Sequence, residues 1–540
     1  MHPAWQNLDI SLLIFEHLNP RSLARIARTC KALFHVATDE LWKTLDSVLP
    51  FLSCLHPDFR NRRLQDKDVK SLDFYAAKVR NLLLESQTVL RLPRQFRPRK
   101  SQTQESWEEI WKEIANLRQL QRQRQLTSDF LPNLRHLRVN NVEEEFLIPL
   151  IGMSGSNLTQ IYIKSLHERQ SKSIVFQMLD QLQSTAKLEY LFVRDGEPDL
   201  VPSQVIRDAP LKHLRLDPRI HGHRHEEFNF KQFPLRQEIL QKSSLENLTL
   251  GLTRQWCTPE IKASKEKYLP ALKSLWLNLT TFKPERCDMS CVNMTSHSWT
   301  CYGPGTDNTT DCGRRPPTRF LEGLDNPELS ILIIKFPIEA TGRMFLDVVS
   351  AANKSCRLGS LTELALAGGG YFNNCPECRI HPGSDIKPTE LREALKMLLP
   401  MPKLKTLRLS VAPNFLDVLD LQLYESITSG LPALEKLYLG HREFTTSSEF
   451  HGTVYREAVP VYHLAAFCSM LPSLVEVGVG TVDTLTLEES PRTEWACPSV
   501  RSLRIGHYAY PTVTSESRVA LQNLLLLSFR AYFPNSDRAQ

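Results

Sequence analysis

The chain has 540 residues and a formal charge of +6, with 41% hydrophobic and 23% charged residues. This length exceeds what one ordinary core supports, so several units or a repeat array are expected. The composition is that of a globular protein, and no apolar run is long enough for a membrane span. Residues 1–11 lack a basic segment followed by an apolar core. We therefore expect no secretory signal, a location in the cytoplasm or nucleus, and cysteines that stay reduced.

Residues 8–45 have the apolar spacing of three or four short helices. In the first, Leu8, Leu12 and Phe15 recur as one stripe. Asn19 is a good N-cap for a second helix that begins at Pro20. A segment of about forty residues cannot bury all of its apolar groups alone, so some should face a partner or the following domain.

The second and third helices follow the same logic. The second should place one apolar face against the others, made of Leu23, Ile26, Ala27 and Cys30. Its opposite face carries Arg21, Arg25 and Arg28. The third groups Leu33, Phe34, Ala37 and Leu41. Thr38 and Asp39 are expected to cap a separate last turn that carries Leu41, Trp42 and Leu45.

This stretch resembles an F-box. The family pattern is roughly L-P-x-E-I-x-x-x-I-F-x-x-L, then L-x-x-x-x-x-V-C-x-x-W, then L-W. The matching or nearly matching residues are Ile10, Ile14, Phe15, Leu18, Leu23, Cys30, Phe34, Leu41 and Trp42. The chain departs from the pattern at Gln6-Asn7, which replaces Leu-Pro, and at Phe34, which replaces Trp. The resemblance implies docking on a Skp-type adaptor, and through it on cullin and RING subunits. The adaptor-binding residues would be Leu12, Ile14, Phe15, Leu18, Leu23, Cys30, Phe34, Leu41 and Trp42.

Residues 51–130 form a basic connecting region. Between Arg60 and Phe130 there are sixteen Lys or Arg and nine Asp or Glu, so most of the net charge lies here. The run from Arg91 to Lys100 has five basic residues and no acid, which favours a solvated loop over a steering patch or nuclear address. We read residues 69–84 as a linker leading to a strand, and residues 106–126 as a helix.

A short pattern, apolar-x-x-apolar-x-apolar, then returns twelve times. Its first apolar residues are Leu134, Leu158, Leu188, Leu211, Leu245, Leu272, Leu329, Leu361, Leu404, Leu434, Leu474 and Val500. Helical patterns lie between copies, for example Leu391, Ala394, Leu395 and Leu398, and Val461, Leu464, Cys468 and Leu471.

This repeat resembles the leucine-rich repeat, and most intervals fit its length of about 20–30 residues. The implied fold class is α/β, a leucine-rich-repeat solenoid (horseshoe) preceded by a small all-α F-box domain. The Asn or Cys that the family places three residues after the pattern is replaced, for example by Val142, Ala412 and Arg442. The predicted domains are an F-box at 1–50, a basic linker with the first strand and helix at 51–130, and repeats at 131–535. A Cys-containing insert is predicted at 282–317.

Three clusters of cysteine or histidine have some features of a metal site, but none has a complete ligand set with the usual spacing. Cys287, Cys291, Cys301 and Cys312 lack the paired C-x2-C spacing of zinc sites. Cys375, Cys378 and His381 form only half of a site, and His221, His223 and His225 read as a polar loop. No nucleotide-binding or hydrolase motif occurs, and Gly368-Gly369-Gly370 lacks the Lys-Ser/Thr of a phosphate loop. We expect no metal, no cofactor, no nucleic acid and no catalysis.

The residue between the last two apolar positions of each copy points away from the core, because side chains alternate along a strand. In a solenoid these residues line the concave face. Eight of the twelve are Arg or aromatic: Arg138, Tyr162, Phe192, Arg215, Trp276, Arg408, Tyr438 and Arg504. Such residues dominate binding hot spots, although bulky residues also favour strands. The arginines indicate a protein substrate with acidic or phosphorylated groups.

The two resemblances together imply the substrate-recognition subunit of an SCF-type ubiquitin ligase. Two alternatives stay open. In the first, the chain is a repeat scaffold whose F-box-like segment packs only on its own repeats. In the second, the chain is an enzyme whose active site lies in the cysteine-containing insert.

Overall fold

The fold is taken from a computed structural model of the whole chain. It describes residues 7–29, 31–47, 50–51, 54, 66–85, 131–140, 156–163, 179–180, 182, 186–194, 201–217, 237–251, 269–279, 320–324, 326–336, 342–355, 358–368, 388–410, 421–439, 459–483, 493–509 and 515–536. The chain divides into two compact units, residues 1–218 and 219–540.

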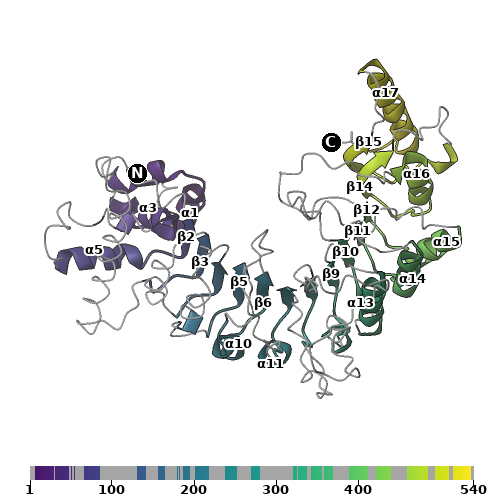
Figure 1. Cartoon of the computed structure of the whole chain (residues 1–540). Helices are drawn as coiled ribbons and strands as arrows, with labels where there is room; N and C mark the ends of the chain where they lie inside the picture. The colour runs from purple at the N-terminus through teal and green to yellow at the C-terminus, as the bar shows by residue number, and fades with distance from the viewer. Residues whose placement is uncertain are drawn as a thin grey trace, which may run out of the picture. The chain divides into compact units, whose positions relative to one another are not determined.

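The first unit begins with three helices and continues as a parallel sheet (Figure 1). Its helices are α1 (Leu8–Glu16), α2 (Pro20–Thr29), α3 (Lys31–Lys43), α5 (Asp66–Ala76) and α10 (Ser203–Asp208). Its strands are β1 (Thr44–Leu45), β2 (Asn81–Glu85), β3 (His136–Asn140), β4 (Gln160–Ile163), β5 (Tyr190–Arg194) and β6 (His213–Asp217). Each strand pairs in parallel with the next.

The second unit repeats the same plan of parallel strands and covering helices. Its strands are β7 (Asn247–Gly251), β8 (Ser274–Asn278), β9 (Ile331–Phe336), β10 (Glu363–Gly368), β11 (Thr406–Ser410), β12 (Lys436–Leu439), β13 (Val459–Pro460), β14 (Glu476–Asp483) and β15 (Ser502–Ala509). Its α-helices are α11 (Gln237–Leu240), α13 (Gly342–Ser355), α14 (Pro388–Leu398), α15 (Leu421–Gly430), α16 (Val461–Ser469) and α17 (Ser515–Tyr532). Short 3-10 turns lie at Leu358–Ser360 and Thr493–Trp495. In Figure 1, α13, α14 and α15 follow one side of strands β9 to β12.

The register of the strands places equivalent repeat positions side by side. In the first unit Leu82, Leu137, Ile161, Leu191 and Leu214 are successive partners. In the second unit the corresponding partners are Leu248, Leu275, Leu332, Leu364, Leu407, Leu437, Val477 and Leu503. All of these side chains are buried. The predicted repeat architecture is therefore confirmed.

Main-chain hydrogen bonds at the start of each strand hold this register. The carbonyl of Arg80 accepts bonds from the N–H groups of Arg135 at 2.8 Å and His136 at 3.0 Å. The carbonyl of Arg135 then accepts from Thr159 at 2.8 Å and Gln160 at 2.9 Å. The same two-donor step recurs through both units, so each strand start fixes the next.

Hydrogen bonds also close the turns that precede the strands, whereas the positions of the missing family Asn, such as Val142, Ala412 and Arg442, lie outside the described residues. The N–H of the first apolar residue bonds the carbonyl three residues earlier, as in Leu134 to Leu131 at 3.2 Å. A side-chain amide adds a second tie, as in Asn157 Nδ2 to the Pro132 carbonyl at 2.8 Å. Asn326 is buried and bonds the carbonyls of Leu269 and Leu272 at 2.9 and 2.7 Å.

The stretch read as a linker, residues 69–84, is helix α5 followed by strand β2. Val79, Leu82 and Leu84 are buried and occupy the apolar positions of the repeat pattern, so this segment is a further copy that the count of twelve missed. The strand was predicted and is confirmed, whereas the linker reading was wrong.

The three-helix region packs around a small core of its own. Asn19 Oδ1 accepts the N–H of Ser22 at 2.9 Å, which confirms the predicted cap of α2. The core holds Phe15, Leu23 and Ala37, with partly buried neighbours Leu18, Ile26, Ala27, Leu33, Val36 and Leu41. The predicted break at Thr38 and Asp39 is wrong, because α3 runs through both residues and Thr38 is buried.

The same region also joins the repeats directly. Strand β1 follows α3 at once and pairs with β2 in the register Thr44 to Asn81. Asn81 Nδ2 donates to Thr44 Oγ1 at 2.8 Å, and the ring of Trp42 stacks on Tyr75 of α5 at 4.4 Å. The helical region therefore supplies the first strand of the repeat sheet in this unit.

The predicted helices between later copies are confirmed. In α14, Leu391, Ala394, Leu395 and Leu398 are buried. The second set, Val461, Leu464 and Cys468 of α16 together with Leu471, is buried as well. The predicted helix at 106–126, the basic run at 91–100 and the insert at 282–317 lie outside the described residues.

Candidate functional site

Helix α1 presents an exposed apolar face. Asn7 caps it by accepting the N–H groups of Asp9 at 3.0 Å and Ile10 at 3.3 Å. The exposed fractions are 41% for Ile10, 37% for Leu12, 62% for Leu13 and 36% for Ile14. Four aliphatic side chains that stay in water together form the kind of patch that marks a protein interaction site.

The opposite side of α1 provides the packing. Ser11 and Phe15, four residues apart, are buried, and the Phe15 side chain is fully enclosed. Of the predicted stripe, Phe15 is buried whereas Leu12 is 37% exposed, so the stripe lies at the edge of the packed side of α1 and is buried only in part. Leu12 and Ile14, which were predicted as adaptor contacts, are exposed, and Ile10 and Leu13 are exposed beside them.

Three of the predicted adaptor contacts need correction, because Phe15, Leu23 and Trp42 lie in the interior. Trp42 is enclosed by aromatic neighbours, with ring centroids 4.4 Å from Tyr75 and 5.5 Å from Phe51. These side chains shape the domain and offer no surface for direct docking. Leu18, Phe34 and Leu41 are partly buried, and Cys30 lies outside the described residues.

In the first unit, the predicted face residues of four neighbouring strands stack on one another. Arg138, Tyr162, Phe192 and Arg215 are successive register partners on β3 to β6. The Arg138 guanidinium lies 5.0 Å from the Tyr162 ring centroid, and that of Arg215 lies 4.8 Å from the Phe192 ring. The two rings stack at 4.1 Å and 20°. We call these four residues the β3–β6 stack.

Burial separates the members of the β3–β6 stack. Phe192 is only 2% exposed, so it supports its neighbours and is corrected from a predicted contact to a packing residue. Arg138, Tyr162 and Arg215 are partly exposed. Cation–π contacts of this kind contribute about 0.5–1 kcal/mol at exposed sites.

A second row lies beside the β3–β6 stack, two residues earlier on each strand. It comprises His136, Gln160, Tyr190 and His213. The rings of Tyr190 and His213 lie 5.4 Å apart. Burial, and secondarily the charge of Arg135, lowers the pKa of His136. This row was not predicted from the sequence, although its constant offset of two residues from the face positions would have located it.

The corresponding row of the second unit has a different electrostatic character. The Arg408 guanidinium lies 3.4 Å from a carboxylate oxygen of Glu363 and 4.6 Å from the Tyr438 ring. Arg504 pairs with Glu476 at 3.0 Å, and Lys436 pairs with the same carboxylate at 3.5 Å. We call these six residues the β10–β15 network.

Tyr438 lies inside the β10–β15 network. Burial raises its pKa to about 12, and a hydrogen bond to the Glu476 carboxylate adds to the shift. Tyr438 is buried and is therefore corrected from a predicted contact to a packing residue. The positive charges of Arg408 and Arg504 are matched by the carboxylates of Glu363 and Glu476, two residues that the repeat pattern alone does not associate with them. Trp276 is partly exposed between Thr249 and Ile333.

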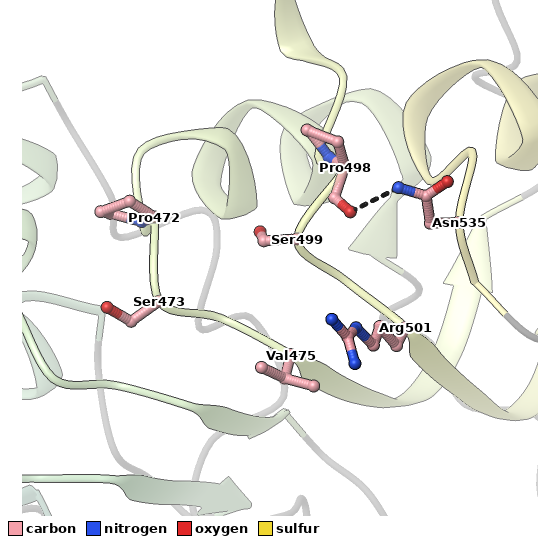
Figure 2. Close-up of a pocket in the computed structure, with 7 residues that line it drawn as sticks. All are labelled: Pro472, Ser473, Val475, Pro498, Ser499, Arg501 and Asn535. Atoms are coloured by element: carbon pink, nitrogen blue, oxygen red, sulfur yellow. Dashed lines mark hydrogen bonds between the residues drawn. The ribbon is translucent and has the colours of Figure 1, made fainter.

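A pocket of about 660 Å³ lies beside the turns that precede β14 and β15 (Figure 2). It is lined by Pro472, Ser473, Val475, Pro498, Ser499, Arg501 and Asn535. Ser473 Oγ donates to the Pro432 carbonyl at 3.0 Å, and Asn535 Nδ2 donates to the Pro498 carbonyl at 2.8 Å. Two of its polar side chains thus tie repeat turns together, so the pocket belongs to the turn edge of the repeats.

Three described cysteines, Cys54, Cys468 and Cys497, are free thiols. Burial raises the pKa of Cys54 and of Cys497 to about 12, and raises that of Cys468 as well. In the described part of the chain, no three His, Cys, Asp or Glu side chains are grouped around a common metal position. The cysteine and histidine clusters considered from the sequence lie outside that part. None of the helices within it is long and apolar enough to span a bilayer.

Comparison with known proteins supports the predicted F-box at the N-terminus. Residues 8–47 match the F-box-like family model. No curated protein matches the sequence. The register and the recurring strand pattern define a leucine-rich-repeat protein. The chain thus carries an F-box-like domain at residues 8–47, followed by a repeat sheet of the leucine-rich-repeat type.

Similar solved structures include a leucine-rich-repeat protein of Leptospira interrogans, with 13% identity over 92% of this chain and 99% of the other, and a TM-score of 0.30. A chain of the yeast Rad7 and Elc1 complex has 14% identity over 84% of this chain and 93% of the other, and a TM-score of 0.34. LegL7 of Legionella pneumophila has 10% identity over 70% and 92%, and a TM-score of 0.25. Because these TM-scores are low, the fold is assigned from the parallel pairing and register of the strands in this chain.

Proposed function

We propose that this chain is a non-catalytic substrate-recognition subunit of an SCF-type ubiquitin ligase. The exposed face of α1 docks on a Skp-type adaptor, which connects the chain to cullin and RING subunits. The strand face of the repeats holds a protein substrate with acidic or phosphorylated groups. The chain itself performs no bond-making step, and its contribution is to hold a substrate lysine near a charged ubiquitin-conjugating enzyme.

The observation that carries this proposal is the separation of the two faces of α1. Phe15 and Ser11 are the residues of α1 that are buried within the described part of the domain, whereas Ile10, Leu12, Leu13 and Ile14 stay 36–62% exposed. Apolar side chains in water gain about 25 cal/mol for each Å² that a partner covers. The match to the F-box-like family supports a Skp-type adaptor as that partner, by family resemblance.

The joint between the domain and the repeats suits such a role. Lys78 pairs with Asp39 of α3 and lies 4.4 Å from the Phe74 ring of α5. The Arg80 N–H donates to the Lys43 carbonyl at 3.0 Å. These ties, with the β1–β2 pairing, hold the F-box-like domain firmly to the first repeats, so a bound substrate is held at a defined position relative to the adaptor.

The same joint also favours the alternative that the chain is a scaffold acting outside a ubiquitin ligase. In that case the F-box-like segment would serve only to cap its own repeat sheet through β1 and α5. The two functions differ in the role of α1, because adaptor docking needs its exposed face and capping of the repeat sheet does not.

The test is the double variant Leu12→Ala, Ile14→Ala in the full chain. Truncating well-placed apolar contacts typically costs about 2 kcal/mol or more, so capture of a Skp-type adaptor should fall by about thirtyfold or more. The matched control is Leu526→Ala, Leu527→Ala, which removes two exposed leucines from α17. Unfolding temperature should change little in either variant, because exposed positions seldom contribute much to stability.

Two results would decide against the ligase role. Undiminished capture by the Leu12, Ile14 variant would show that α1 is not the docking face. Failure of the unmodified chain to capture any Skp-type adaptor would favour the scaffold. Phe15→Ala is unsuitable for this test, since emptying a core position costs about 3–5 kcal/mol and would unfold the domain.

A further inference from the structure

The pocket beside the turns that precede β14 and β15 contains an arginine. Among the described residues that line it, Arg501 is the one that carries a charge. Its guanidinium extends into the space between Ser499 and Val475 (Figure 2). The hydrogen bonds of Ser473 and Asn535 hold the turns on either side of this space, so the walls are formed before any ligand arrives.

Arg501 belongs to a row of residues along the turn edge of the second unit. Each member directly follows the first apolar residue of its copy, and its N–H donates to the carbonyl of the preceding member at 2.8–2.9 Å. Consecutive members are therefore neighbours in space. We call this set the turn row, and it comprises Glu246, Lys273, Ser330, Thr362, Lys405, Glu435, Val475 and Arg501.

The other charged members of the turn row pair with a neighbour. Lys273 pairs with Glu246 at 2.9 Å, and Lys405 pairs with Glu435 at 2.8 Å. The side chain of Arg501 makes no hydrogen bond, ion pair or ring contact within the part of the chain that the structure describes. An apolar residue takes the place of the carboxylate beside it. The donors of Arg501 are therefore available to a ligand in the pocket.

Apolar surface borders the same space. Val475, Pro472 and Pro498 line the pocket, and all three are exposed. Covering exposed apolar surface with a ligand is favourable. The volume of about 660 Å³ is large enough for a few side chains of a bound segment. The pocket thus offers one cationic contact and one apolar contact next to each other.

We propose that this pocket binds a protein segment in which an acidic side chain stands next to an aliphatic one. The carboxylate pairs with Arg501, and the aliphatic side chain covers Val475 and the two prolines. A purely apolar ligand would cover Arg501 without giving it a partner, which is costly, and a purely acidic one would leave the apolar wall in water. The inference goes beyond the proposed function, because the pocket belongs to the turn edge and uses neither α1 nor the strand face.

The test uses fluorescein-labelled peptides of mixed Gly and Ser that carry one Glu-Leu pair, in either order. Matched peptides carry Gln-Leu, which removes the charge, or Glu-Ser, which removes the aliphatic side chain. Binding to the full chain is measured by fluorescence anisotropy without an adaptor, so failure here and failure of the adaptor test are distinguishable. We expect the better Glu-Leu order to bind about tenfold more tightly than either matched peptide, because each of these lacks one of the two contacts.

Variants assign the two contacts to their residues. Arg501→Gln should weaken the Glu-Leu peptide about tenfold and leave the Gln-Leu peptide unchanged, because only the first loses a charged pair. Val475→Ser should weaken the Glu-Leu peptide to about the level of Glu-Ser, and Ser330 shows that the turn row accepts serine. Arg135→Gln is the matched control, since Arg135 is an exposed arginine at the same repeat position in the first unit. The unfolding temperature of each variant confirms that its fold persists.

Three outcomes would overturn the proposal. Equal affinity for the Glu-Leu, Gln-Leu and Glu-Ser peptides would show that the two contacts do not act together. A loss with Arg135→Gln equal to that with Arg501→Gln would show diffuse electrostatic attraction. Tighter binding of free isovalerate than of the Glu-Leu peptide, dependent on Arg501, would assign the pocket to a small carboxylate instead of a protein segment.

Discussion

The β10–β15 network leads to a prediction about the pKa of Tyr438 and the stability of the fold. Glu476 is nearly buried and pairs with Arg504 at 3.0 Å and Lys436 at 3.5 Å, while it accepts a hydrogen bond from Tyr438. Glu476→Gln preserves the size and one acceptor but removes the charge. The pKa of Tyr438 should therefore fall from about 12, yet stay above its ordinary value of 10.0 because burial is the largest cause of the shift.

The cost in stability can be worked from the same contacts. Arg504 and Lys436 are about half exposed, so each ion pair contributes roughly 0.2–1 kcal/mol. The bond from Tyr438 loses its charged acceptor, which weakens it by about 1 kcal/mol. We expect Glu476→Gln to lower the free energy of unfolding by about 2 kcal/mol.

The pH dependence has a defined sign. Between pH 10 and about 12 the unfolded chain releases the Tyr438 proton while the folded chain retains it. The free energy of unfolding therefore falls as the pH rises through this window. Because Glu476→Gln lowers the pKa of Tyr438 in the folded chain, the upper pH limit of the window should move down.

The assay is a pH titration of tyrosinate absorbance, with Tyr438→Phe as the difference that isolates this residue. Circular dichroism at each pH reports whether the fold persists. Glu363→Gln is the control, since Glu363 pairs with Arg408 and is not among the causes that raise the Tyr438 pKa. An unchanged Tyr438 titration in Glu476→Gln would refute the reasoning.

Further predictions concern the turns and the thiols. Asn326→Ala should lower the free energy of unfolding by about 3 kcal/mol, because it removes three hydrogen bonds from a buried site, whereas Asn133→Ala, with one exposed bond, should cost below about 1 kcal/mol. Equal losses of stability in urea titrations would contradict this. Cys54, Cys468 and Cys497 should react with iodoacetamide at pH 8 only slowly until the chain unfolds, because their raised pKa values leave little thiolate. Peptide mapping by mass spectrometry checks this, and rapid labelling of the folded chain would argue against it.

Much of the fold could be predicted because the repeat pattern is long and regular. Each copy carries its own register, so the alignment of Leu137, Ile161, Leu191 and Leu214 follows from their shared offset. The cap at Asn19 was predictable for a local reason, since its side chain bonds an N–H three residues on. The copy at residues 79–84 was missed because its first residue is Val, without a preceding Pro.

The face of α1 was harder to predict because apolar residues surround much of that helix. Ile10, Leu12, Leu13, Ile14 and Phe15 fall in six successive positions, so periodicity alone does not select the buried side. Packing against α3 makes the selection, and it buries Phe15.

The ion-pair partners of the face residues could be predicted only from the strand register together with the row of residues two positions earlier. The offset that aligns Arg408 with Tyr438 also places Glu363 and Glu476 two residues before Ala365 and Gly478. Reading one row alone gave eight arginine or aromatic residues and suggested a uniform binding face. Reading both rows shows that the arginines on β11 and β15 have carboxylate neighbours.

The central claim is that the exposed face of α1 binds a Skp-type adaptor while the repeats remain available. The most direct measurement is hydrogen–deuterium exchange of the full chain with and without purified adaptor. Binding should slow exchange of backbone amides in and next to α1, and leave α17 and the strands β3 to β6 unchanged. Unaltered exchange in α1 at saturating adaptor, or protection confined to the repeat strands, would contradict the account.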